Sequence, residues 1–285
     1  MPRTRASAPP GATEVSNVPF SGGVHAPGRA RIAARTLRED RWWLQPFVTF
    51  VCFSAWLLYG LVRASLQRDY FVADYGYLTP FYSPCLSTSC VPGSTHFGTP
   101  FGEWPALIPF AALTLPFLLL FRLTCYYYRK AYYRSFWNSP PACAVPEAHR
   151  EYSGETRFPL IMQNLHRYFF YAAVVISLIN TYDVLHAFRG RDGGFGLGLG
   201  TLILLANVVL LWCYTLGCHS CRNIVGGRLN HFSKHPLRYK AWGLVGKLNA
   251  RHMLFAWVTL GSLVVTDAYI ALVSAGTIGD FRIIN

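Results

Sequence analysis

Five long apolar stretches constrain this chain more than any other feature of its sequence. A helix needs about 20 apolar residues to cross the hydrocarbon core of a bilayer. Of the 285 residues, 52% are hydrophobic and only 14% are charged, whereas a soluble domain is about one quarter charged. The sequence therefore predicts an all-α integral membrane protein, a bundle of five transmembrane helices. The predicted spans are residues 44–64, 105–126, 165–188, 195–217 and 252–275.

The basic residues are distributed unevenly between these spans, and their distribution predicts the orientation of the chain. Loops that are translocated across a membrane are depleted of Lys and Arg. Three segments hold 21 of the 26 basic residues, namely the N-terminal segment, the loop after the second span and the loop after the fourth span. We therefore expect a multi-pass protein of the plasma membrane, with its N-terminus cytoplasmic and its C-terminus external. The net charge of +13 reflects this topology, which makes nucleic-acid binding the weaker interpretation.

The segments outside the spans complete the predicted organisation. Residues 1–43 are expected to form a cytoplasmic segment, in which the amphipathic stretch Arg31 to Trp43 predicts a helix on the membrane surface. Residues 44–277 would form the transmembrane domain, with an external loop at 66–104. The last residues, 278–285, would form an external tail.

Two cysteines of the external loop are close together in the sequence. Cys85 and Cys90 are separated by four residues. A pair on the oxidising side of a membrane can form a disulfide. Two free thiols are the alternative, and the sequence leaves both open.

Two cysteines and two histidines are predicted to meet at the cytoplasmic ends of three spans. Cys218 and Cys221 end the fourth span at i and i+3, which places them on one helical face about one turn apart. His166 and His252 begin the third and fifth spans. With the predicted orientation, all four side chains lie at one depth, as in sites built between the facing helices of a bundle.

Two thiolates and two imidazoles suit a metal centre. They fit a tetrahedral zinc ion, or a Rieske-type [2Fe-2S] cluster with Cys on one iron and His on the other. Replacing thiolates by imidazoles raises the reduction potential of a cluster, which suits electron transfer to a quinone. Packing of the cysteines and interfacial positions for the histidines are the alternative. Cys125, beside the second span, is interpreted as a packing residue.

Three segments resemble a known family. They are GCHSCRN (Gly217 to Asn223), the basic loop GGRLNHFSKHPLRYKAW (226–242) and LNARHMLFAW (Leu248 to Trp257). Together with the five-helix plan, they resemble the membrane anchor subunit of actinobacterial, mycobacterial-type succinate dehydrogenase, respiratory complex II. The resemblance covers about residues 40–275.

The resemblance implies a role in electron transfer. It implies a Rieske-type [2Fe-2S] cluster near the cytoplasmic face, held by His166, Cys218, Cys221 and His252. It also implies two partners, an iron–sulfur subunit and a flavoprotein subunit that oxidises succinate. This chain would carry no catalytic residue for succinate and would relay electrons to menaquinone or another quinone.

A quinone site needs hydrogen-bond donors for two carbonyl oxygens and an apolar slot for the tail. Several aromatic or hydroxyl side chains are expected near the cluster. These candidates are Tyr126, Trp212, Tyr214, Ser220 and Trp242.

Two other functions remain open at the level of the sequence. The first is a haem b anchor of the same complex, with His166 and His252 as axial ligands. The second is a transporter or receptor with a structural zinc site, in which Asn180, Asp183 and Asp267 line a polar path. These three polar residues are costly in lipid, so we expect them to face the bundle interior or the interface.

Overall fold

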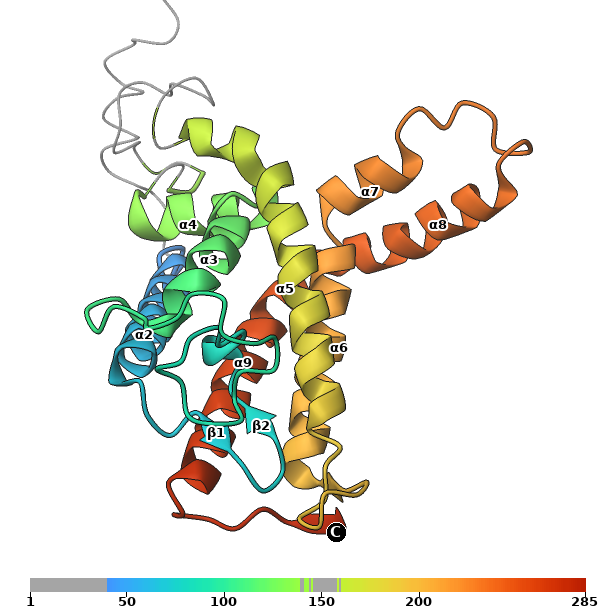
Figure 1. Ribbon diagram of the computed structural model, residues 1–285. Coiled ribbons are helices and arrows are strands. Elements are labelled where there is room, and N and C mark those ends of the chain that lie inside the picture. Colours follow the sequence, from blue (N-terminus) through green and yellow to red (C-terminus); the bar gives the residue numbers. More distant parts are fainter. Residues whose placement is uncertain (1–39, 139–140, 144, 146–157, 159) are drawn as a thin grey trace, which may run out of the picture.

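Four helices dominate the structure (Figure 1). The computed structural model describes residues 40–138, 141–143, 145, 158 and 160–285. Within these residues, four helices are long and apolar enough to cross a membrane. They are α2 (Leu44–Leu66), α5 (His166–His186), α6 (Leu199–Leu216) and α9 (His252–Ser274). They correspond to four of the predicted spans, and the largest difference is the start of α6, predicted at residue 195 and observed at Leu199.

The second predicted span, 105–126, differs from its prediction. It contains a 3-10 turn, η2 (Phe110–Leu113), and the short helix α3 (Leu115–Leu123). Extended backbone at Cys125 then separates α3 from α4 (Tyr126–Phe136). Prolines at positions 105, 109 and 116 explain the difference, because proline is tolerated only in the first turn of a helix. This segment is therefore not one continuous helix, and a fifth crossing of the membrane stays a prediction.

The helices pack as a bundle with a projecting hairpin. α6 packs on both α5 and α9, α3 packs on α5, and α2 packs on α4 and α9. The hairpin consists of α7 (His219–Gly226) and α8 (Pro236–Ala250). It leaves the bundle at the end opposite to the C-terminus (Figure 1).

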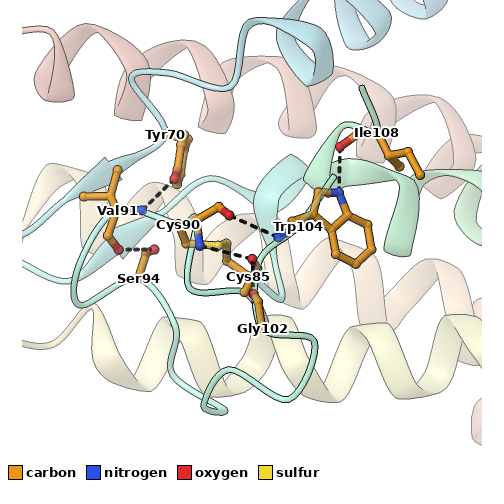
Figure 2. The surroundings of a disulfide bond; sticks show 10 residues. Tyr70, Cys85, Cys90, Val91, Ser94, Gly102, Trp104 and Ile108 are labelled. Atoms are coloured by element: carbon orange, nitrogen blue, oxygen red, sulfur yellow. Dashed lines mark hydrogen bonds between the residues drawn. A yellow bond between two sulfur atoms is a disulfide. The ribbon is translucent and has the colours of Figure 1, made fainter. Parts of the chain in front are cut away.

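The predicted external loop is a packed structure. Strands β1 (Phe71–Val72) and β2 (Tyr77–Leu78) pair antiparallel, and the turn η1 (Pro80–Tyr82) follows them. Cys85 and Cys90 form a disulfide with a Cα–Cα distance of 6.4 Å (Figure 2). Of the two alternatives for these cysteines, the structure contains the bridge.

The C-terminal tail is tied to the start of α6. Strand β4 (Arg282–Ile284) pairs with β3 (Leu197–Gly198). The carboxylate of Asp280 accepts hydrogen bonds from the Gly200 N–H at 2.9 Å and the Tyr77 hydroxyl at 2.8 Å. The tail and the loop 66–104 therefore pack together at one end of the bundle.

The polar residues within the spans face the interior, as predicted. Asn180, Asp183 and Asp267 are all buried. Asp267 accepts from the Arg63 guanidinium and the Tyr59 hydroxyl, each at 2.6 Å. Asp183 accepts from the Ser83 hydroxyl, and the Asn180 amide donates to a carbonyl oxygen of its own helix. Because each has a local partner, these residues are engaged in packing contacts between and within elements.

The predicted surface helix lies largely outside the described residues. Its last four residues, Asp40 to Trp43, form a bend and a turn before α2 begins. The helix predicted over Arg31 to Trp43 therefore does not continue to its predicted end.

Candidate functional site

Four side chains, three of them buried and one half-buried, meet at the end of the bundle from which the hairpin projects. Each stands where a helix begins. Cys125 is the N-cap of α4 and Cys218 is the N-cap of α7. His166 and His252 are the first residues of α5 and α9. Backbone N–H groups at a helix start favour negative charge, and Ser220 N–H indeed points to the Cys218 sulfur at 3.4 Å.

The four side chains form two pairs. The distance from His166 Nε2 to Cys218 Sγ is 3.0 Å. The distance from His252 Nε2 to Cys125 Sγ is 3.5 Å. Cys218, Cys125 and His252 are at most 2% exposed. Each pair therefore joins one buried thiol and one imidazole, and of the two imidazoles only His252 is fully buried.

Cys221 has a different place from the one that the sequence predicts for it. It is buried one turn further along α7, in the same apolar cluster. Within the described part of the chain, its sulfur has no hydrogen bond to either histidine. Cys125, instead of Cys221, is the second cysteine in contact with a histidine. The sequence indicated its depth, because the second predicted span ends at residue 126, on the same side of the membrane as Cys218.

Aromatic rings hold both imidazoles in place. Phe121 stacks on His166 with ring centroids 5.1 Å apart, and Tyr214 stacks on His252 at 4.8 Å. Thr124 Oγ1 donates to the Leu120 carbonyl and lies 2.8 Å from His166 Nδ1. That nitrogen therefore carries the hydrogen, which leaves the Nε2 lone pair directed at Cys218. An oriented imidazole of this kind is typical of metal ligands.

The two pairs can be tested against a metal centre. Among the described residues, no three or more His, Cys, Asp or Glu side chains converge on one point as a metal site. Sulfur and nitrogen ligands of one tetrahedral metal lie about 3.5 Å apart, because their bonds are about 2.3 and 2.0 Å long. The His252–Cys125 pair matches this separation, and the His166–Cys218 pair is about 0.5 Å shorter. Each Cys–His pair therefore suits one metal ion, which differs from the Rieske arrangement of both Cys on one iron and both His on the other. Within the described residues, His252 Nδ1 is buried and has no hydrogen-bond partner by the usual distance and angle criteria.

Burial also controls the state of the thiols at the start of α7. Burial and the neighbouring Cys125 thiol raise the pKa of Cys218 to about 12, and burial raises the pKa of Cys221. Both thiols therefore stay protonated unless a bound cation favours the thiolate.

A cavity of about 230 Å³ adjoins the two pairs. It lies at the break between α3 and α4, beside the 3-10 turn η4 (Leu160–Leu165) that precedes α5. Its wall combines a phenol, two amides, two imidazoles, a hydroxyl and a thiol. The lining residues are Thr124, Cys125, Tyr126, Gln163, Asn164, His166 and His219.

The sequence-predicted quinone residues divide into two groups. Tyr126 lines the cavity. The other four have roles elsewhere: Trp212 donates to Thr181 at 2.8 Å, Tyr214 stacks on an imidazole, and the Ser220 backbone caps a thiol. Trp242 lies under the Arg222 guanidinium in the hairpin. Gln163, Asn164 and His219 were missed, because the first two lie in η4 and the third begins α7, and no local sequence pattern brings these two elements to one wall.

The fold and the site together define a helical, multi-pass membrane subunit with a buried Cys/His centre at one end. A family model described as actinobacterial succinate dehydrogenase subunit SdhC matches residues 44–276, and the chain belongs to this family. It is thus a membrane subunit of succinate dehydrogenase, whose other subunits are its partners and carry the enzyme activity. The resemblance to the succinate dehydrogenase anchor is confirmed at this level.

A solved structure is similar over most of the chain. It is described as the Mycobacterium smegmatis Sdh1 complex in the apo form. The similar chain is 64% identical, with a TM-score of 0.84, and the match covers 88% of this chain and 95% of that chain. Among curated proteins, no match to the chain is found.

Proposed function

We propose that this subunit relays electrons from the iron–sulfur subunit of succinate dehydrogenase to quinone through an intramembrane [2Fe-2S] cluster. The observation that carries the proposal is the meeting of two Cys–His pairs where four helices begin, with both thiols and His252 buried. A [2Fe-2S] cluster supplies a one-electron carrier, and imidazole ligands raise its reduction potential. Succinate is oxidised on the flavoprotein subunit, so this chain needs no catalytic residue for succinate.

The proposed ligands differ by one residue from those that the sequence predicts. His166, Cys218 and His252 are retained, and Cys125 replaces Cys221. Cys125 supports this assignment because its sulfur is 3.5 Å from His252 Nε2. As the N-cap of α4, it also stands at a helix start as Cys218 does.

Haem b is a weaker fit to these side chains. A haem iron with two axial histidines needs an open slot between the two imidazoles. Here the Nε2 atoms of His166 and His252 each face a thiol, and aromatic rings cover one face of each imidazole. The arrangement favours a compact centre that uses the thiols. Zinc accepts the same donors but transfers no electrons, so metal analysis is part of the test.

Spectroscopy of the whole complex tests the cluster and its ligands. On reduction, we expect a paramagnetic resonance signal of low average g-value, typical of mixed His and Cys ligation. Cys125→Ser should abolish this signal because a hydroxyl is a poor ligand for iron, whereas Cys221→Ser should retain it. Cys213→Ser, on α6, is the matched control.

Three results would contradict this assignment. Loss of the signal in Cys221→Ser with retention in Cys125→Ser would restore the sequence-predicted ligand set. A haem absorption band that survives replacement of both Cys125 and Cys218 would identify a haem anchor. Zinc in this subunit, with no iron or acid-labile sulfide beyond that of the partner subunits, would leave it without a relay function.

The cavity beside the pairs is the proposed site of the quinone head group. A quinone that accepts electrons must lie next to the carrier, and this cavity shares Cys125 and His166 with the two pairs. Tyr126, Gln163 and His219 offer hydrogen-bonding groups to the two carbonyl oxygens. The volume of about 230 Å³ admits a ring system, and the apolar tail would extend into lipid.

Removal of one hydroxyl tests this assignment. We expect Tyr126→Phe to raise the KM for quinone about fivefold, since a hydrogen bond contributes about 1 kcal/mol. Steady-state kinetics with quinone and with a soluble dye would separate this effect from succinate oxidation, which should not change. Tyr168→Phe, on the exposed surface of α5, is the matched control. An unchanged KM in Tyr126→Phe would exclude this tyrosine from the quinone site.

The orientation is part of the same proposal. The N-terminus and the Cys–His pairs are placed at the cytoplasmic face of the plasma membrane, and the C-terminus outside. The segregation of basic residues supports this orientation, because the hairpin loop alone carries seven of them. The iron–sulfur subunit would then dock on the face nearest to the pairs.

A further inference from the structure

The hairpin α7–α8 is held at the level where two membrane-length helices end. α6 ends at Leu216, and only Gly217 and Cys218 separate it from α7. A single residue, Arg251, joins α8 to α9. The Asn249 amide donates to the Gly217 carbonyl at 2.7 Å and fastens the base of the hairpin. Figure 1 shows α8 running across the direction of α5 and α6 instead of continuing it. The hairpin therefore projects sideways from the bundle at the level where α6 ends and α9 begins.

All charged side chains of the hairpin are basic. Residues 218–251 contain seven Arg and Lys side chains and no Asp or Glu. Arg222 and Arg238 are engaged with Trp242 and with backbone carbonyls of α7 and its end. The other five are exposed and form no salt bridge in the part of the chain that the structure describes. These five are Arg228, Lys234, Lys240, Lys247 and Arg251.

The outer face of α8 alternates apolar and cationic side chains. Leu237, Lys240, Leu244 and Lys247 follow one another at intervals of three or four residues, so they share one face of the helix. Leu237 is 81% exposed and Leu244 is 62% exposed. The opposite face carries Val245, which is buried. Both exposed leucines would be left in water if nothing covered this face.

We propose that the outer face of α8, defined by Leu237, Lys240, Leu244 and Lys247, binds the phosphate groups of anionic phospholipids at the membrane surface. The two leucines insert below the head groups while the two lysines extend to the phosphates, as in helices that lie in the membrane interface. Unpaired cations near an anionic lipid surface attract it strongly. The bound lipids hold α7 in position, and with it the Cys218 end of the site.

Lipid suits this face better than an acidic surface of a partner subunit. The hairpin is joined at both ends to membrane-length helices and projects sideways from the bundle, which brings its outer face to the level of the lipid head groups and away from the docking face at the pairs. Leucines and lysines are interleaved along one line instead of forming an apolar core with a polar rim, which is the pattern of protein interfaces. This proposal is independent of the cluster and of the quinone site.

Binding of a soluble short-chain phosphatidylglycerol to the intact, detergent-solubilised complex tests the proposal. We expect Lys240→Ala and Lys247→Ala each to weaken binding roughly fivefold, and the double variant by roughly 25-fold, because each cation contributes about 1 kcal/mol. Lys240→Arg with Lys247→Arg retains the charge and should bind as the unaltered complex does. Arg68→Ala removes an exposed cation from the opposite end of the molecule and should have no effect.

Amide hydrogen exchange in nanodiscs gives a second, independent readout. Residues 236–248 should be more protected in discs that contain phosphatidylglycerol than in discs of phosphatidylcholine alone, and the double alanine variant should lose this difference. Equal protection in both lipids would overturn the proposal and indicate that a protein partner covers the face. Unchanged phosphatidylglycerol affinity in the double alanine variant would also overturn it.

Discussion

Cys218→Ala is expected to lower succinate–quinone oxidoreductase activity by roughly 100-fold or more, while succinate oxidation with a soluble dye continues at its normal rate. Cys218 is fully buried and lies 3.0 Å from His166 Nε2, so its removal takes away one of the four proposed ligands. The dye accepts electrons from the partner subunits and bypasses this chain. The two activities, measured on the same purified complex, check the prediction.

The control for Cys218→Ala is a thiol of similar size outside the site. Cys213→Ala removes a partly buried thiol from α6 and should retain both activities. A second measurement, the subunit composition of the purified variant, shows that the complex has assembled. Near-normal quinone reduction by an assembled Cys218→Ala complex would refute the relay through this site.

Asp267→Ala is expected to destabilise the folded subunit by about 3–5 kcal/mol, since it leaves the Arg63 guanidinium buried without a counter-charge. The Asp267 carboxylate is fully buried, and its Oδ2 atom is 2.6 Å from Arg63 Nε. The pair joins α2 to α9, so its loss loosens contacts between helices far apart in the sequence. The thermal midpoint of the complex, together with the yield of assembled complex, measures the effect.

Two comparisons isolate the buried pair. Asp74→Ala breaks an exposed pair with Arg191, in which the charged atoms are 3.9 Å apart, and should change stability by less than about 1 kcal/mol. Arg63→Met combined with Asp267→Leu removes both charges and should recover most of the lost stability. A thermal midpoint of Asp267→Ala equal to that of Asp74→Ala would show that the pair contributes nothing.

The site was only partly predictable. The depth of His166, Cys218 and His252 followed from span boundaries, because each residue lies at the end of a long apolar stretch. The prediction of Cys221 as a fourth ligand relied on its spacing from Cys218 and on the family resemblance, and it stays a prediction. Spacing along one helix predicts which residues share a face, but it does not predict which other helices pack against that face. Cys125 and His252 are 127 residues apart in the chain, and only packing brings them together.

The break after α3 decides several other features of the site. Had residues 105–126 formed one helix, Gln163 and Asn164 would have faced an unbroken helical surface. The prolines that prevent this helix are visible in the sequence. Their effect on the shape of the site appears only when α4 and η4 are placed around the break, where the cavity forms.

By itself, the sequence determined the membrane class, four of the spans and the inward position of Asn180, Asp183 and Asp267. These are local properties, because the cost of exposing a residue to lipid depends on that residue and on the 20 or so around it. Tertiary structure decided which thiol meets which imidazole, where the cavity lies and how the loop and the tail pack together. Those features depend on contacts between residues far apart in the chain, such as Cys125 with His252 and Tyr77 with Asp280, which no local pattern specifies.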